Sequence, residues 1–172
     1  MKRRWALVVM GAWTMGSICM SIVATQNFYT VDRLLADQHG AFAAMVQKLG
    51  QPAARELLRY LSSELNRLYF QIWNVAQIVL GAAVLWLVSE RRVRLGVMAM
   101  LAVVVLMLAY LTPSIVSLGR ELDFVPRNPE PPGMSRFWVF HAAYTSLEML
   151  KLAGGLLVAA WLTRSASPAP PA

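Results

Sequence analysis

Four polar or ionisable side chains follow one another at helical spacing in an otherwise apolar segment. They lie at positions i, i+3, i+7 and i+10, so an α-helix would bring them onto one face. Histidine titrates near neutral pH, and glutamate and tyrosine also take part in proton transfer. The pattern is therefore compatible with a proton or ion relay as well as with structural roles. The residues are His141, Tyr144, Glu148 and Lys151.

The segment that carries these residues, 137–163, is long enough to cross a bilayer as one helix. Glu148 and Lys151 would then lie near its middle, where a lone charge costs about 2.5–3.5 kcal/mol or more. A surface that faces lipid does not tolerate this cost. We therefore expect this face of the helix to meet protein, a water-filled cavity or a partner.

Three roles remain open for this face. Glu148 and Lys151 are three residues apart and can pair directly, which would make them a neutral structural pair that fixes the orientation of the helix. A relay through His141, Tyr144 and Glu148 is the second role. Docking of another membrane helix against the face is the third.

A second polar stripe enters the segment 69–88. Arg67, Gln71 and Asn74 share one helical face, and the sequence leaves open whether Arg67 or Gln71 is a partner of Glu148. Side chains in such positions commonly bond across helices, for about 0.6–2 kcal/mol each, so interhelical stabilisation is their simplest role. The two stripes together make one candidate intramembrane polar site: His141, Tyr144, Glu148, Lys151, Gln71, Asn74 and Arg67.

Fewer polar side chains lie elsewhere in the apolar segments. Gln77 stands at the margin of the second stripe, and Thr14 and Ser17 lie in the first apolar segment. The segment 95–113 holds only apolar residues until Tyr110. We therefore expect this third segment to face lipid or to contribute packing alone.

The composition identifies the elements that must position these residues. The chain has 172 residues, of which 58% are hydrophobic and 15% are charged, whereas soluble domains carry about 25% charged residues. Because lipid offers backbone groups no water, the spanning segments must be helices. The sequence predicts an all-α, integral membrane four-helix bundle. Its spans lie at about residues 5–24, 69–88, 95–113 and 137–163.

Three further segments connect or flank the spans. Residues 25–68 predict an outer helical loop, in which a helix that ends at Gly50 and another that begins near Pro52 form an amphipathic helical hairpin. Residues 114–136 contain the run NPEPPG and predict a Pro-rich outer loop. The segment 164–172 is small and Pro-rich, and we expect it to be disordered.

The net charge of +7 follows the pattern of a membrane protein rather than that of a nucleic-acid-binding protein. The outer loop 25–68 is also basic, but acidic residues partly balance it. We expect the basic residues 1–4 and the C-terminus to be cytoplasmic, in a bacterial inner membrane, with an uncleaved first span. Cleavage of a signal peptide after Ala24 is the alternative. Seven basic residues fall on the predicted cytoplasmic side: Lys2, Arg3, Arg4, Arg91, Arg92, Arg94 and Arg164.

The sequence offers little for enzymatic or cofactor chemistry. His141 is the one histidine within a span, so a haem would need methionine ligation or a second subunit. The single cysteine, Cys19, cannot form an intramolecular disulfide or a cysteine metal cluster. No motif for a phosphate loop or a catalytic triad appears. We expect no enzymatic activity, no cofactor and no metal.

A pattern of residues runs through the four spans: Gly11, Trp13, Tyr69, Phe70, Pro113, His141, Thr145 and Ser146. This pattern resembles that of the four-helix membrane family called domain of unknown function 4149, also described as transmembrane protein 205-like. The resemblance implies a four-span topology, a helical outer loop and an important position at His141, but no reaction or ligand. Glu148 and Lys151 depart from the family pattern.

These observations favour a small non-catalytic interaction or accessory membrane protein that uses a buried polar helix face. Its expected partners are the lipid bilayer and a membrane protein or a second copy of the chain. The alternative is a small-solute or proton transporter, with His141 and Glu148 lining a hydrated path together with Gln71 or Asn74.

Overall fold

The computed structural model describes residues 1–37 and 39–164, and within these residues the chain is helical with no strand. The predicted disordered tail, apart from Arg164, lies outside the described residues. The elements are α1 (Lys2–Ala36), α2 (Gly40–Leu49), α3 (Gln51–Leu87), α4 (Arg91–Leu106), the π-helical turn η1 (Met107–Leu111), α5 (Thr112–Glu121) and α6 (Met134–Arg164).

Four of the helical stretches are long and apolar enough to cross a membrane, which makes the chain a multi-pass membrane protein. They are α1, α3, the continuous stretch Arg91–Glu121 and α6, with 35, 37, 31 and 31 residues. A helix rises 1.5 Å per residue, and about 20 residues cross the hydrocarbon core. Each stretch is therefore longer than its predicted span and extends beyond the apolar part of a membrane.

The Pro-rich loop predicted at 114–136 is shorter in the structure, because the third stretch continues to Glu121. Residues 114–121 belong to α5 and residues 134–136 to α6, so the connector is only 122–133. Pro113 lies in the first turn of α5, where the missing N–H is tolerated, and the π-helical turn η1 directly precedes it. The helix therefore continues through a proline that the sequence analysis placed at its end.

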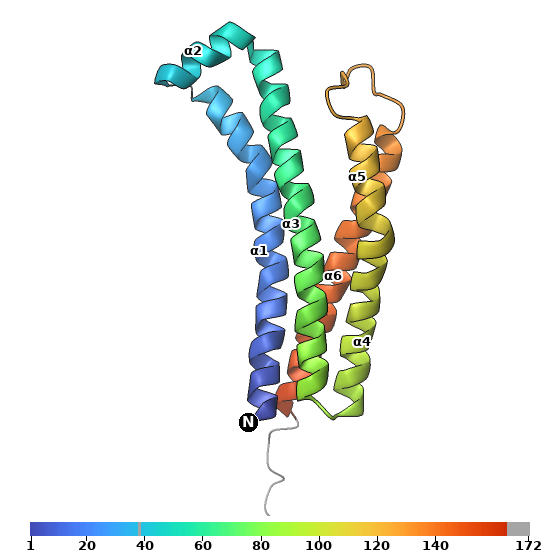
Figure 1. Ribbon diagram of the computed structural model, residues 1–172. Helices are drawn as coiled ribbons and strands as arrows, with labels where there is room; N and C mark the ends of the chain where they lie inside the picture. Colours follow the sequence, from blue (N-terminus) through green and yellow to red (C-terminus); the bar gives the residue numbers. More distant parts are fainter. Residues whose placement is uncertain (38, 165–172) are drawn as a thin grey trace, which may run out of the picture.

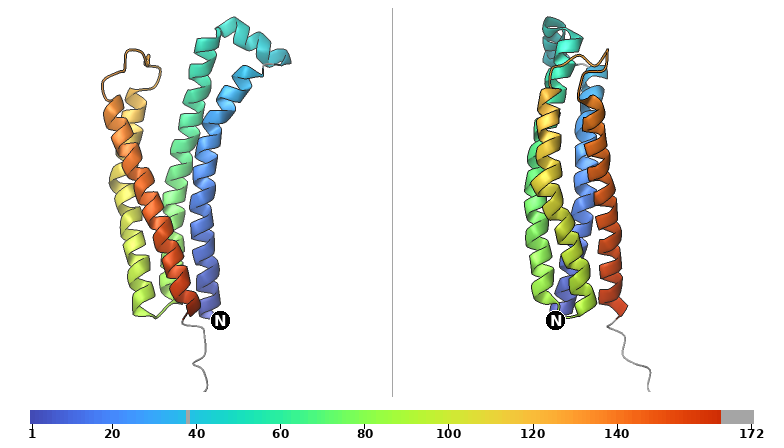
Figure 2. Two further views of the ribbon diagram at one scale, coloured as in Figure 1. Left: turned by 180° about the vertical axis from the view of Figure 1, so that it is seen from behind. Right: turned by 90° about the vertical axis from the view of Figure 1, so that its right-hand side faces the viewer.

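The long helices lie side by side, with α1 against α3 and α6, and α4 against α3 and α6 (Figures 1 and 2). The N-terminus, the α3–α4 turn and the end of α6 gather at one end of the molecule (Figure 1). At the other end, α1 and α3 run on together past α5, and α2 lies across their tips (Figure 1). We call the end with the N-terminus the basic end and the opposite one the outer end.

The main hydrophobic core lies toward the basic end and draws on all four long helices. Its buried members include Met10 and Trp13 of α1, Val84 of α3, Val97 of α4 and Val158 of α6. The helix α4 buries one side chain on each turn through this core, so its role is internal packing rather than lipid contact alone.

Toward the outer end, α1 and α3 are joined by polar contacts between their backbones and short side chains. Asn27 Nδ2 donates to Asn66 Oδ1 at 2.6 Å, Asn66 Nδ2 donates to the Ala24 carbonyl at 3.1 Å, and Ser62 donates to the Asn27 carbonyl at 3.1 Å. Residues 25–36, which the sequence analysis placed in the outer loop, thus continue α1. They make α1 the neighbour of the first half of α3.

Candidate functional site

The centre of the candidate site is the buried ammonium group of Lys151 on α6. It lies 2.7 Å from Glu148 Oε1 and also donates a hydrogen bond to Gln77 Oε1 on α3. The same amide oxygen accepts a bond of 3.0 Å from Trp13 Nε1 on α1. Lys151 and Glu148 are 3% and 6% exposed, so this pair has been removed from solvent.

A second branch of hydrogen bonds joins this centre to the stretch Arg91–Glu121. Gln77 Nε2 donates to Asn74 Oδ1 at 3.4 Å, and Asn74 Nδ2 donates to Thr112 Oγ1 at 3.0 Å. The Tyr144 hydroxyl donates to Asn74 Oδ1 in a long bond of 3.5 Å. We call the connected set the buried polar network: Trp13, Asn74, Gln77, Thr112, Tyr144, Glu148 and Lys151.

The helical repeat explains how each element presents its part of the network. Asn74, Gln77 and Gly81 lie three or four residues apart and therefore face the same way from α3. A Cβ atom at Gly81 would lie 2.5 Å from Leu101 and 3.0 Å from the Trp13 ring. The missing side chain at Gly81 thus leaves room for the Trp13 indole, one turn from the amide to which it donates.

The charges of the network balance, but its hydrogen bonds do not. Lys151 and Glu148 together are neutral, and burial makes each of them depend on the other, because a lone charge in such a place is costly. Glu148 Oε2 is buried and has no hydrogen-bond partner within the described residues. This oxygen is the one open acceptor of the pair.

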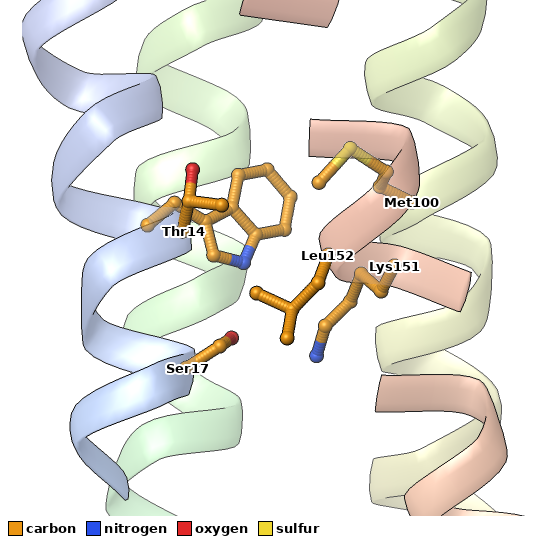
Figure 3. A pocket seen from close by; sticks show the side chains of 6 residues that line it. Thr14, Ser17, Met100, Lys151 and Leu152 are labelled. Atoms are coloured by element: carbon orange, nitrogen blue, oxygen red, sulfur yellow. The ribbon is translucent and has the colours of Figure 1, made fainter. Parts of the chain in front are cut away.

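The space beside the network is narrow. A gap between α1 and α6 is lined by Trp13, Thr14, Ser17, Met100, Lys151 and Leu152, and it is too tight to hold a water molecule. Figure 3 shows Thr14 and Ser17 of α1 on one side of this gap and Met100, Lys151 and Leu152 on the other. The gap therefore provides no hydrated path past Lys151.

His141 does not join the network. It is exposed, and its ring lies 5.8 Å from Phe137 and 5.9 Å from Trp138 on its own helix. At 100° per residue, the predicted stripe covers about 80° of the helix surface, with His141 at one edge and Lys151 at the other. Only the part of the stripe around Tyr144, Glu148 and Lys151 turns inward. The structure thus leaves His141 outside the relay considered from the sequence.

Arg67 and Gln71 lie apart from the network, nearer the outer end. The Arg67 guanidinium bonds the carboxylate of Glu64 and lies 2.9 Å from Asp123, beyond the end of α5. A Cβ atom at Gly119 would lie 3.1 Å from Arg67 Nη2, so the glycine lets the guanidinium cross α5. Glu148 therefore pairs with Lys151 in the structure, and not with Arg67 or Gln71.

These outer residues line an open groove between α3 and α5, with a volume of about 360 Å³. Arg120 contributes a second guanidinium, 3.3 Å from Glu64 Oε2. We call this feature the outer groove. Its lining is half apolar and half polar: Leu61, Leu65, Leu68 and Val116 with Glu64, Arg67, Gln71 and Arg120.

Sequence reasoning missed three members of the network. Gln77 was placed at the margin of its stripe, although it is one turn from Asn74 and shares its face. Thr112 lies in a segment predicted to provide packing alone. Trp13 offered a usable signal, because a buried indole N–H requires an acceptor.

Within the described residues, no three His, Cys, Asp or Glu side chains come together as a metal site. Comparison of the chain with protein-family models, curated proteins and solved structures gives no match in any of the three.

Proposed function

We propose that the chain is a non-catalytic interaction or accessory protein of a membrane. In this proposal the buried polar network holds the four long helices in register, and the outer groove contacts another component of the membrane. One observation carries it: the Lys151 ammonium is held by Glu148 and Gln77 of the same chain, and the adjoining gap is too narrow for water. A network of this kind is suited to fixing a structure rather than to passing a solute.

The chemistry of the side chains that connect Tyr144 to Lys151 supports the same proposal. A proton relay needs groups that both accept and release a proton, such as hydroxyls, carboxyls, imidazoles or water. Between Tyr144 and Lys151 the connection runs through the side-chain amides of Asn74 and Gln77. Amides donate and accept hydrogen bonds in fixed directions but do not take up or release a proton near neutral pH. They therefore interrupt a proton path while still tying α3 to α6.

The orientation and location are part of the proposal. We place the four helices as a bundle in a bacterial inner membrane, with the basic end in the cytoplasm and the outer groove on the opposite side. The basic residues near the N-terminus, the α3–α4 turn and the end of α6 support this orientation. The resemblance to the domain of unknown function 4149 family predicts the same four-span topology.

The first test measures flux. Purified protein is reconstituted into lipid vesicles, and proton, sodium and potassium movements are followed under imposed gradients from acidic to alkaline pH. The proposal expects the flux of protein-free vesicles in every case. Flux above that of protein-free vesicles with the folded wild-type protein would overturn the proposal, and its loss in a Glu148→Gln variant shown to be folded would assign the path to Glu148.

The second test locates the contact surface. A photo-reactive residue at Leu61 in the outer groove is compared with one at Leu156, an exposed position on α6 outside the groove. We expect one discrete adduct from position 61 in native membranes and only a diffuse set of lipid adducts from position 156. The same diffuse set at both positions would remove the groove as the contact surface.

A second candidate function, transport of a proton or small solute, is favoured by one feature. Glu148 Oε2 is a buried carboxylate oxygen without a partner in the described residues, and such an atom can accept a proton or a cation. Transport would require α1 and α6 to separate and hydrate the gap beside Lys151. The flux measurement with Glu148→Gln decides between the two functions.

A further inference from the structure

We propose that the outer groove binds one phospholipid of the outer leaflet. Its phosphate would lie at Arg120, its ester carbonyl at Gln71, and an acyl chain would follow the apolar wall of the groove. This inference deepens the proposed function, because it names the class of ligand that the groove takes.

The depth of the groove supports a lipid. A helix of about 20 residues crosses the hydrocarbon core. Counting this length back from Leu87, the inner end of α3, reaches Leu68, and counting it forward from Leu95 on α4 reaches Ser114, two residues before Val116. Leu68 and Val116 both line the groove. The groove therefore lies at the plane where the hydrocarbon core meets the headgroups.

The polar lining is arranged by depth in the order of a phospholipid's own groups. Arg120 lies one helical turn outside Val116, at the level of the headgroups, and Gln71 lies about one turn inside Arg67. The Gln71 side chain is exposed and makes no hydrogen bond within the described residues. An amide at hydrocarbon depth without a protein partner is costly. The ester carbonyl of a phospholipid lies just below its phosphate and is the acceptor that a lipid brings to this depth.

Two guanidinium groups and one carboxylate, Arg67 and Arg120 with Glu64, leave the lining with an excess of positive charge that complements a phosphate. A guanidinium carries five N–H donors, and in the described part of the chain Arg120 uses one of them, on Glu64 Oε2. Guanidinium groups match phosphate oxygens in geometry and charge. The Arg67 guanidinium, held by Glu64 and Asp123, fixes the floor of the groove below this position. The donors left on Arg120 point to a phosphate as the headgroup's anchor.

The apolar lining and the size of the groove fit a chain and part of a headgroup. Leu61, Leu65 and Leu68 lie on one face of α3 opposite Val116 of α5, and Leu61 and Leu68 are about half exposed. The volume of about 360 Å³ falls within the range of about 300–1,000 Å³ typical of small-ligand sites.

The experiment counts bound lipid by native mass spectrometry after titration of the detergent-solubilised protein with a diester phospholipid. We expect one lipid to remain bound at saturation. Its affinity should fall about tenfold in Arg120→Gln, as expected for the loss of a charge-assisted hydrogen bond. The matched control is Arg136→Gln, which removes an arginine from the start of α6, outside the groove. Val116→Trp, which fills the groove, should also reduce occupancy, whereas Ser117→Trp on the neighbouring exposed position should not.

Two further arms identify the ligand. An ether-linked phospholipid, which lacks the ester carbonyls, should bind more weakly than the diester lipid, and glycerol phosphate alone should not compete. Equal binding by all variants, or full competition by glycerol phosphate, overturns the phospholipid. A photo-adduct from Leu61 that contains a protein rather than a lipid overturns it as well, while leaving the proposed function in place. Transport in vesicles would overturn the proposed function without changing lipid occupancy, so the two failures are distinguishable.

Discussion

The molecule pairs a partly or fully buried glutamate with basic side chains in two places, and the surroundings of the two sites differ. Near its middle, Glu148 pairs with Lys151, and the two side chains are 8% and 1% exposed. Toward the outer end, Glu64 pairs with Arg67 and Arg120, with exposures of 32%, 11% and 56%. The first pair lies among helices that are packed together, and the second lines an open groove. The same chemistry thus stabilises the core at one level and leaves donors available at the other.

This difference follows from desolvation. In a low-dielectric site each charge strongly depends on its partner, whereas near solvent the water can replace the partner at small cost. The buried pair should therefore be sensitive to the removal of either charge. The cluster of Glu64, Arg67 and Arg120 should tolerate the removal of one charge. This tolerance suits a site in which a ligand replaces contacts within the protein.

The largest effect should come from Lys151→Met, which leaves Glu148 buried without a cation. We expect a loss of about 3–5 kcal/mol in the free energy of unfolding. Replacing both charges, by Glu148→Gln with Lys151→Met, should recover much of this loss, because no lone charge remains. The measurement is a double-mutant cycle from thermal and denaturant unfolding in detergent. Two single variants as stable as the wild type would mean that the pair does not hold the helices, and would direct attention to transport.

The next effect should come from Gly81→Ala, which tests how tightly the network is packed. The new Cβ atom would meet Leu101 at 2.5 Å and the Trp13 ring at 3.0 Å, so one of them must move. Overpacking of this kind costs about 1–3 kcal/mol. The control is Gly11→Ala, where a Cβ atom meets nothing within 4 Å and the higher helix propensity of alanine should stabilise α1 slightly. Equal stability of the two variants in unfolding experiments would contradict the close approach of α1, α3 and α4.

The same residues show what could be predicted from the sequence and what could not. The four apolar helices follow from composition, and Tyr144, Asn74, Glu148 and Lys151 follow from helical spacing. Hydropathy marks the part of a helix that crosses lipid and not the point where the helix ends. The helices therefore run past their predicted spans.

Two features depend on the packing of helices that are distant in sequence. The neighbouring helices decide which part of the stripe turns inward, and they leave His141 exposed at its edge. Thr112 joined the network only because α3 packs against the start of α5, which brings its hydroxyl to 3.0 Å from Asn74 Nδ2. No periodicity within a single segment contains that information.

A smaller effect is expected beside the outer groove, where Asp123→Asn removes one of the two carboxylates that hold Arg67. The Arg67 and Asp123 side chains are 11% and 15% exposed, so screening by water is partial. We expect a loss of about 1–2 kcal/mol, intermediate between exposed and buried pairs. The loss should shrink in high salt, since screening weakens an interaction near the surface. A salt-independent loss as large as that of Lys151→Met would remove the distinction between the two sites.

The smallest effect is expected at the outer tip, where the Asp32 carboxylate bonds Arg55 between α1 and α3. The two side chains are 49% and 40% exposed, and Arg59 lies 3.9 Å from the same oxygen. Exposed pairs contribute about 0–1 kcal/mol, so Asp32→Asn should change the free energy of unfolding by no more than about 0.5 kcal/mol. The neighbouring contacts from Asn27 to Asn66 and from Ser62 to the Asn27 carbonyl remain to hold the two helices. Amide hydrogen exchange on the outer part of α3 provides the measurement. Exchange that becomes fast there in Asp32→Asn would mean that an exposed charge pair, and not the hydrogen bonds of Asn27, Ser62 and Asn66, joins the ends of α1 and α3. The contributions of the ion pairs of Glu148, Asp123 and Asp32 to stability would then no longer follow the burial of these carboxylates.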